Sequence, residues 1–354
     1  MRLQLLCALP VAQTVSTLEL WDQLTRTRQQ AEHWHAEARR LQCQIDRRDS
    51  CDSTPVGSSV ARVHASHSEV SANITAARKK LELWRKKAGR LSCVLNGVGP
   101  TGGFCMTKKS GAVGGNGCLP ATLAPFLAHR WAGKNVLELG CGTGPWGRYL
   151  KEHAPTVHWV GLDGAEMIEE ATGHFVQFAD LSLGLPQFVF HRHWDVVMSI
   201  EVGEHVPRSG EASFMHNLVA LQPQKVIVSW AVLGQGGHHH INCQTNAYVK
   251  CAMRLLGWRS DATMERRLRS LVHDFAWSRN ATDPFTREEV MSISCPWLQH
   301  TVMAFDPELP DPAQGSSRAT IPIPRAATLE FAREYERRTA AECGYVENGC
   351  ERKV

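Results

Sequence analysis

A short segment of apolar residues and glycines, Val136–Gly144, constrains the fold of this chain more than any other part of the sequence. Its first four residues predict a buried strand that is interrupted by one acidic side chain, Glu138. Glycines then follow at alternate positions, Gly140, Gly142 and Gly144. Because glycine has no Cβ, such a turn brings backbone N–H groups close to a ligand. The segment therefore predicts the nucleotide-binding corner of a doubly wound α/β domain.

The residues after this turn distinguish three kinds of nucleotide site. A phosphate-binding P-loop needs Lys-Ser or Lys-Thr after its last glycine, and neither follows here. The G-x-G-x-x-G pattern of dinucleotide-binding enzymes fails from Gly140, because its last position is Pro145. Gly142, Gly144 and Gly147 satisfy that pattern, but they begin two residues too late for tight packing on the strand end. A nicotinamide-dependent oxidoreductase therefore stays an alternative.

The third kind of site fits the segment from end to end. An apolar strand with an internal glutamate, followed by G-x-G-x-G, resembles the class I S-adenosylmethionine-dependent methyltransferase family over residues 136–144. The resemblance implies S-adenosylmethionine as the cofactor. It also implies a first group of cofactor-binding residues: Glu138, Gly140, Gly142 and Gly144.

Two acidic residues further along the chain extend the resemblance. Asp163 ends a predicted second strand, 158–162, and in the family an acid at this position accepts hydrogen bonds from the ribose hydroxyls. Asp180 follows a predicted third strand, 175–179, where the family binds the adenine amino group and the next apolar residue, here Leu181, covers the ring. Dehydrogenases also carry an acid at the first of these positions. The second aspartate is equally suited to capping a turn.

A polar segment, Glu201-Val-Gly-Glu-His205, follows a predicted fourth strand of continuous apolar residues, 194–200. Ionisable side chains at the carboxyl end of a central strand lie where ligands bind in this class of fold. The E-x-x-E-H spacing resembles ubiquinone-pathway O-methyltransferases and small-RNA terminal 2′-O-methyltransferases. In the second branch the two glutamates and the histidine bind a divalent metal, together with a histidine that follows the next strand.

The resemblance implies a metal site with these ligands: Glu201, Glu204, His205 and His240. The last of them belongs to a glycine-rich loop, residues 234–242, which also carries His238. Carboxylate and imidazole ligands suit Mg²⁺, Mn²⁺, Fe²⁺ or Zn²⁺. Other interpretations stay open: Glu201 lines the methionine pocket, His205 acts as a metal-free base or caps a helix, and the histidines form an exposed loop.

This segment favours a hydroxyl group as the methyl acceptor. An alcohol is a poor nucleophile until its proton leaves, and a bound metal lowers its pKa while a histidine or glutamate takes the proton. We therefore expect O-methylation of a small molecule or sugar, with these catalytic candidates: Glu204, His205, His238 and His240. Nucleic acid is a less expected partner. The basic cluster 78–90 lacks the interleaved basic and aromatic residues of single-strand binders and is typical of a solvated helix face.

The predicted α/β domain covers residues 119–306 and has a doubly wound, seven-stranded, Rossmann-like sheet. Its last three strands are expected at 225–230, from Trp258, and at 298–305, with helices at 146–153, 209–221, 244–256 and 264–271. Before it, residues 17–98 show two stretches of heptad spacing, separated by a linker at about 49–69. These predict a helical, coiled-coil region that pairs as a hairpin, forms a homo-oligomer or packs on the domain. A non-catalytic scaffold protein built on these helices is a second alternative.

The remaining segments leave the cellular compartment open. Residues 1–16 are a weak signal-peptide candidate or the start of the first helix, and no segment is long and apolar enough to span a membrane. Twelve cysteines, several near the Gly/Cys-rich linker 99–118 and in the tail 307–354, predict disulfides in a secretory lumen and free thiols in the cytoplasm. The tail is expected to be helical over 326–343.

Overall fold

The structure of this chain is a computed structural model. It describes residues 22–30, 32–34, 36–37, 67–96, 98–99, 103–106, 119–120, 122–272, 281–282, 289–290, 295–308, 320–324 and 326–350. The chain divides into two compact units, Met1–Pro100 and Thr101–Val354. Among the described residues, no helix is both long and apolar enough to cross a lipid bilayer.

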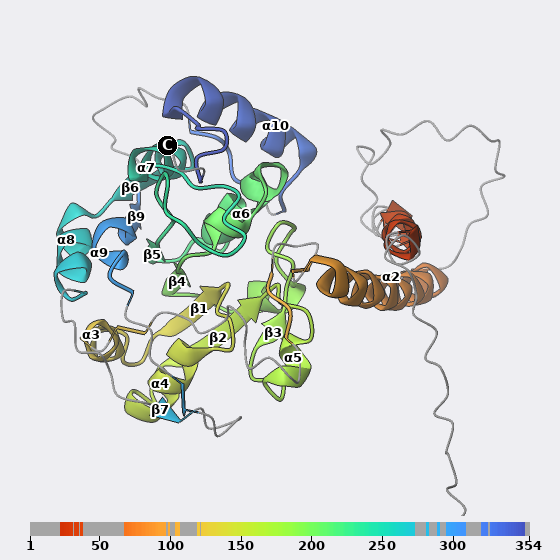
Figure 1. Cartoon of the computed structure of the whole chain (residues 1–354), viewed down its shortest axis with the longest axis horizontal. Coiled ribbons are helices and arrows are strands. Elements are labelled where there is room, and N and C mark those ends of the chain that lie inside the picture. Colours follow the sequence, from red (N-terminus) through yellow and green to blue (C-terminus); the bar gives the residue numbers. More distant parts are fainter. Residues whose placement is uncertain are drawn as a thin grey trace, which may run out of the picture. The chain divides into compact units, whose positions relative to one another are not determined.

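The second unit contains a seven-stranded sheet with the order β3-β2-β1-β4-β5-β9-β6 (Figure 1). Its strands are β1 (Asn135–Leu139), β2 (His158–Asp163), β3 (Gln177–Phe178), β4 (Val196–Ser199), β5 (Lys225–Val228), β6 (Trp258–Ser260) and β9 (Met303–Pro307). The first five strands pair in parallel, and β9 lies antiparallel between β5 and β6. The predicted doubly wound, seven-stranded sheet is therefore confirmed.

Helices cover both faces of this sheet, because successive strand residues point to opposite sides. In β1, Val136 packs with α3 (Leu123–Arg130), α4 (Pro145–His153), α8 (Ala262–Ser270) and α9 (Leu298–Thr301). Its neighbour Leu137 packs with α6 (Arg208–Val219), α7 (Asn246–Leu255) and α10 (Leu329–Arg338) on the other face. A third, smaller cluster surrounds α5 (Ile168–Ala171). The buried apolar side chains thus form one core on each face.

The last strand is shorter than predicted. Residues 298–305 were expected to form one strand, but Leu298–Thr301 is the helix α9 and only the part from Met303 is extended. The turn Cys295–Trp297 starts this helix, and the Val302 N–H donates back to the Leu298 carbonyl. A helix of four residues is too short to show a period that separates it from a strand, which explains the error. A small hairpin of β7 (Ala281–Thr282) and β8 (Glu289–Val290) was not predicted.

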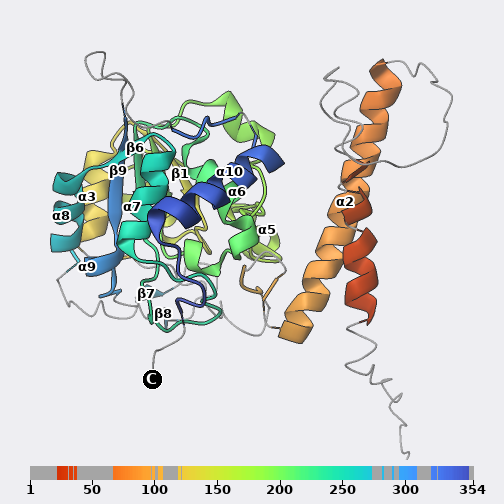
Figure 2. The same ribbon diagram turned by 90° about the horizontal axis from the view of Figure 1, so that it is seen from above.

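In the first unit, helix α2 (His67–Asn96) lies beside the helical residues 22–30, 32–34 and 36–37 (Figure 2). Heptad positions on both segments are buried: Leu24, Thr27, Ala77 and Ala88. The Lys80 ammonium lies 4.2 Å from the centroid of the Trp34 ring, so the two segments contact each other. The hairpin is one of the arrangements that the heptad spacing predicts; the coiled coil and the homo-oligomer stay predictions. The weak signal-peptide candidate lies outside the described residues.

Two disulfides join the end of the chain to the region around α7. They connect Cys243 to Cys350 and Cys251 to Cys343. The predicted tail helix begins at Leu329 and continues as a single π-helical turn, Thr339–Cys343. Three further cysteines are disulfide-bonded, Cys93, Cys105 and Cys295, whereas Cys141 in the glycine turn is a buried free thiol. Nothing in the spacing of the cysteines predicts these long-range pairs.

Candidate active site

The glycine turn, residues 140–144, connects the end of β1 to the start of α4. Its three glycines have positive φ angles of 76°, 55° and 82°, which favour glycine strongly. The turn is tied to the neighbouring strand, because the N–H groups of Gly140 and Cys141 donate to the Leu162 carbonyl. A Cβ on Gly140 would lie 2.3 Å from Val202, so the turn also closely approaches the segment after β4. The backbone of the turn is therefore held in a conformation that bulkier residues cannot adopt.

Asp163, the predicted ribose-binding acid, holds this turn in place. Its Oδ2 accepts a hydrogen bond from the Gly142 N–H at 2.6 Å, and its Oδ1 accepts one from the Ala165 N–H at 2.7 Å. Burial raises the pKa of this carboxyl, although both backbone bonds lower it in part. The side chain lies at the carboxyl end of β2, beside the switch point between β1 and β4, where ligands bind in such sheets.

Glu138 lies in the middle of β1 and is almost completely buried. The Trp159 indole donates a hydrogen bond to its Oε2 at 2.8 Å. Burial raises the pKa of Glu138 to about 8, while the bond from Trp159 lowers it in part and the nearby Asp163 raises it further. The Trp159 ring also occupies the space that a Cβ on Gly147 or Gly161 would need. This tryptophan could not be identified from the sequence, because its contacts depend on how β2 pairs with β1 and packs beside α4.

Asp180 and Leu181 lie directly after β3, at the same edge of the sheet. The Asp180 Oδ1 accepts hydrogen bonds from the N–H and the hydroxyl of Ser182, at 3.0 and 2.6 Å. This is the turn-capping arrangement that the sequence left open as an alternative. Leu181 is buried and packs within the main core. The binding of adenine by these two residues stays a prediction.

The Glu201 side chain is fixed by hydrogen bonds beyond the end of β4. Its backbone φ is +54°, unusual for a residue with a Cβ, and its N–H donates to the Ser229 hydroxyl at 2.8 Å. The carboxylate accepts hydrogen bonds from the Gln235 amide at 2.8 Å and from the Thr301 hydroxyl at 3.2 Å. Both oxygens therefore have partners. Burial raises the pKa of this carboxyl.

Three of the four predicted metal ligands come together: Glu204, His205 and His240. One ligand atom from each lies within 4.8 Å of the others. Glu204 is completely buried, and neither of its carboxylate oxygens has a hydrogen-bond partner among the described residues. The His240 Nε2 lies 3.9 Å from the nearer of these oxygens. Burial raises the pKa of Glu204 well above its usual range, and the nearby Glu201 raises it further. The backbone N–H groups of Glu204 and Ala231 lower this pKa in part, although neither is placed well enough to form a hydrogen bond with the carboxylate.

Backbone carbonyls orient both histidines of this cluster. The His205 Nδ1 lies 3.1 Å from the His239 carbonyl, and the His240 Nδ1 lies 3.1 Å from the Gln235 carbonyl. A carbonyl only accepts, so each Nδ1 carries the proton and each Nε2 keeps its lone pair. Burial lowers the pKa of His205 to about 4 and lowers that of His240 as well. Both rings are therefore neutral at physiological pH.

Phe104 and His238 add an aromatic surface to the cluster. The Phe104 ring centroid lies 5.2 Å from that of His205 and 5.6 Å from that of His238, and it stacks on the latter. The next residues return to the cofactor side: Cys105 forms a backbone bridge with Glu166, and Met106 packs near Cys141. Neither Phe104 nor Gln235 was identified from the sequence. Both belong to glycine-rich segments, where no periodicity marks a contact.

The family model for a methyltransferase domain matches residues 118–277. No curated protein sequence matches the chain significantly. Among solved structures, the 1,6-didemethyltoxoflavin-N1-methyltransferase of Burkholderia thailandensis is 14% identical, with 53% of this chain and 79% of that chain covered and a TM-score of 0.32. The magnesium protoporphyrin IX methyltransferase of Synechocystis PCC 6803 is 15% identical, with 52% and 80% covered and a TM-score of 0.34. The CcbJ methyltransferase of Streptomyces caelestis is 14% identical, with 55% and 92% covered and a TM-score of 0.33.

The matched segment contains the glycine turn, both downstream aspartates and the polar cluster after β4. The strand order is that of a doubly wound sheet with its ligand edge at these residues. A nicotinamide-dependent oxidoreductase and a non-catalytic scaffold are therefore set aside. Residues 118–277 therefore form a methyltransferase domain, as the resemblance to the class I S-adenosylmethionine-dependent methyltransferases implied, and the chain is a methyltransferase that uses S-adenosylmethionine.

Proposed function

We propose that this enzyme transfers the methyl group of S-adenosylmethionine to a hydroxyl oxygen, with Glu204, His205 and His240 forming the reaction centre. The observation that carries the proposal is the Glu204 carboxylate, which is completely buried and has no hydrogen-bond partner among the described residues. A buried carboxyl group without a partner costs free energy that a purely structural role does not repay. A ligand that contacts this carboxylate would remove that cost.

The donor set fits a divalent metal ion. One buried carboxylate and two neutral imidazoles lie around a common point, and each imidazole donates its Nδ1–H to a backbone carbonyl. Such outer hydrogen bonds are typical of histidines that ligate a metal through Nε2. Glu201 would support the site through its bond to Gln235 or would complete it after a change of rotamer. A bound metal would supply Lewis acidity, which lowers the pKa of a coordinated hydroxyl.

The reaction itself is a displacement at carbon. The acceptor oxygen attacks the sulfonium methyl group in line, the new C–O bond forms, and the S–CH₃ bond breaks with its electron pair left on sulfur. The acceptor loses its proton, and we assign the proton to His238, which is exposed to solvent and lies over Phe104. The products are the methyl ether, S-adenosylhomocysteine and a proton.

The surroundings of this cluster support a small molecule or sugar as the acceptor. Phe104 presents an aromatic ring next to His205 and His238. The C–H face of a sugar, or another flat ring that carries neighbouring hydroxyls, would pack against an aromatic side chain while its hydroxyls reach the polar cluster. An RNA ribose offers the same chemistry and is the second acceptor class to test.

Replacement of Glu204 tests the proposal. We expect Glu204→Gln to lower the rate of labelled methyl transfer to a panel of sugar, catechol and RNA acceptors by about 10²–10⁴-fold, because loss of a proposed metal ligand removes Lewis acidity worth several kcal/mol. His205→Ala and His240→Ala should act in the same direction, and EDTA should abolish activity that Mn²⁺ then restores. Affinity for S-adenosylhomocysteine should stay unchanged. His216→Ala is the control, because this buried histidine bonds to the Pro324 carbonyl outside the site.

Full activity in all three variants, with or without EDTA, would exclude this reaction centre. If the three variants lost activity but EDTA left the wild type active, the metal would be excluded and the three residues would remain the proposed reaction centre. Transfer to a nitrogen or carbon acceptor alone would contradict O-methylation.

We also propose that the chain matures in an oxidising compartment such as the secretory lumen rather than in the cytoplasm. Two disulfides with sequence separations of 107 and 92 residues, and three further bonded cysteines, support this. Disulfides of this number are rare where glutathione and thioredoxin keep thiols reduced.

A further inference from the structure

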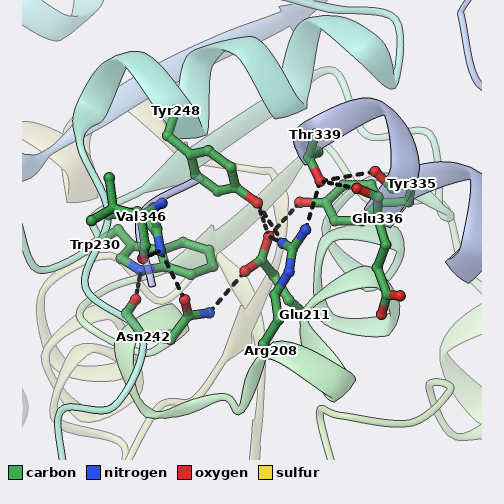
Figure 3. A network of polar contacts seen from close by, with 10 residues as sticks. Arg208, Glu211, Trp230, Asn242, Tyr248, Tyr335, Glu336, Thr339 and Val346 are labelled. Carbon is green, nitrogen blue, oxygen red and sulfur yellow. Dashed lines mark hydrogen bonds and ion pairs between the residues drawn. The ribbon is translucent and has the colours of Figure 1, made fainter. Parts of the chain in front are cut away.

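The C-terminal segment, residues 326–350, packs beside the loop that carries the histidines. Figure 3 shows the polar network through which its helical part is attached. The Tyr335 hydroxyl, from α10, donates to the Glu211 carboxylate at 2.8 Å, and Arg208 donates to the Thr339 hydroxyl at 2.8 Å. Arg208 also lies 4.0 Å from the centroid of the Tyr345 ring. Residues more than 120 positions apart therefore share one buried network.

This network continues to the reaction centre through Asn242. Glu211 is completely buried; its Oε1 accepts hydrogen bonds from Arg208, Tyr248 and Tyr335. Its Oε2 accepts one from the Asn242 amide at 2.8 Å. The backbone N–H groups of Ile241 and Asn242 donate to the Glu204 carbonyl, at 2.8 and 2.9 Å. The end of the histidine loop, residues 234–242, is thus bonded directly to Glu204.

The last residues of the C-terminal segment hold both ends of the histidine loop. At its start, the Gly234 N–H donates to the Gly349 carbonyl at 2.8 Å. Just beyond its end, Cys243 forms the disulfide with Cys350. Next to that bond, the Gln244 side chain exchanges two hydrogen bonds with the backbone of Val346, at 2.9 and 3.1 Å.

Gln235 connects the start of the histidine loop to His240 and Glu201. It follows the bonded Gly234, its carbonyl accepts the Nδ1–H of His240 at 3.1 Å, and its amide donates to Glu201 at 2.8 Å. The amide oxygen is fixed in turn by the Val232 N–H at 3.2 Å. A shift of Gly234 would therefore move the partners of both His240 and Glu201.

We propose that residues 346–350 are a positioning part of the reaction centre, and that the Cys243–Cys350 disulfide holds His240 within reach of Glu204. The inference rests on the proposed function, since it assigns those two side chains to the reaction. The second disulfide, Cys251–Cys343, joins the same two regions but lies on α7, away from the histidine loop. The two bonds thus differ in what they position and much less in the length of chain that they close.

The proposal is tested by removing each of the two disulfides separately. Full-length chains carrying Cys243→Ser with Cys350→Ser, or Cys251→Ser with Cys343→Ser, are compared with the wild type. Hydrogen–deuterium exchange is measured for the peptide that contains Ile241 and Asn242, and Mn²⁺ affinity is measured by electron paramagnetic resonance. We expect at least tenfold faster exchange and at least tenfold weaker Mn²⁺ binding in the first variant, with both quantities within twofold of wild type in the second. Affinity for S-adenosylhomocysteine should stay unchanged in both.

The outcomes separate positioning from general stabilisation. The proposal would be overturned if exchange and Mn²⁺ affinity changed equally in the two double variants. It would also be overturned if exchange stayed at the wild-type rate in Cys243→Ser with Cys350→Ser. If the wild type binds no Mn²⁺, the metal in the proposed function fails, but exchange at Ile241 and Asn242 still decides whether the C-terminal segment holds the loop. Loss of S-adenosylhomocysteine binding in the first variant alone would also overturn it, because the effect would then reach the cofactor side.

Discussion

The glycine turn and the histidine loop, to which we assign the cofactor and part of the proposed reaction centre, are held in different ways. The turn depends on its own residues and on the adjacent strand: Gly142 bonds to Asp163, 21 positions away. The loop depends on distant parts of the chain, with a disulfide that spans 107 residues and a bond from Gly234 to Gly349. The conformation of the glycine turn therefore depends on residues close in the sequence, whereas that of the histidine loop depends on residues from the whole second unit.

This difference indicates how the two functions would fail. A change near the turn should weaken cofactor binding and leave the loop in place, because the strand order alone keeps β1 beside β2 and β4. A change at the end of the chain should leave the cofactor site intact and misplace His240. The following experiments test whether the two regions are as separate as their contacts suggest.

The largest effect is expected for the pH dependence of stability that comes from the buried Glu138. The pKa of Glu138 is about 8 in the folded chain against an ordinary value of 4.5. Between these values the folded chain holds a proton that the unfolded chain releases, so the free energy of unfolding falls as pH rises. The loss from pH 5 to pH 8 should be on the order of 3 kcal/mol for this group. We expect Glu138→Gln, measured by urea unfolding of the cofactor-free chain, to show a smaller decline.

Glutamine keeps an acceptor for the Trp159 indole, so this variant removes the titrating group with little change in packing. Glu204→Gln provides the comparison in the other region, since burial raises the pKa of Glu204 too. If the regions are separate, the two single variants should add in the double variant. If the free energy of unfolding fell as steeply between pH 5 and pH 8 in Glu138→Gln as in the wild type, the raised pKa of Glu138 would be contradicted.

Gly140→Ala should have the next largest effect. The new Cβ would lie 2.3 Å from Val202, and the residue would keep a φ of +76° that alanine rarely adopts. We expect about 100-fold weaker binding of S-adenosylhomocysteine in calorimetry, about 2.7 kcal/mol. Gly133→Ala is the control, because this exposed glycine has a φ of +73° with nothing within 4 Å of a Cβ. Similar losses in the two variants would show that strain alone, rather than the close approach at the turn, sets the affinity.

The same distinction explains what could be predicted from the sequence. The strand β1, the turn, Asp163 and the polar segment after β4 follow from short-range patterns, and the structure places them at one edge of the sheet. Three other contributors were not found. Trp159 contacts Glu138 because β2 pairs with β1, and Phe104 reaches His205 from a glycine-rich segment without periodicity. The helical turn at 298–301 was missed because four residues are too few to show a helical period.

The residues that contact the histidine loop also could not be predicted from the sequence, since no spacing relates Gly234 to Gly349 or Cys243 to Cys350. Long-range contacts of this kind are decided by how α10 and the residues after it pack on α6 and α7. The metal-binding candidates could be identified from the sequence, but the reason that His240 and not Glu201 joins the cluster with Glu204 and His205 could not. That reason is the set of bonds to Gln235.

The smallest effect is expected from Gly237→Ala, which alters only the histidine loop. A Cβ on Gly237 would lie 2.0 Å from the His240 Nε2, the atom that faces Glu204. The φ of Gly237 is outside the left-handed region, so Gly237→Ala adds this contact without backbone strain. The imidazole is the mobile partner and should rotate away from Glu204. We expect methyl transfer to fall about tenfold, about 1.4 kcal/mol in transition-state stabilisation, with unchanged S-adenosylhomocysteine affinity and melting temperature.

Gly184→Ala is the matched control, because this exposed glycine has no atom within 4 Å of a Cβ and lies outside both regions. It should match the wild type in every measurement. Gly237→Ala also separates the position of the His240 ring from the attachment of the loop, since it displaces the imidazole while the disulfide and the Gln235–Glu201 bond stay intact. Wild-type activity in this variant would mean that His240 is not part of the reaction centre, and the loop would then act through His238 alone.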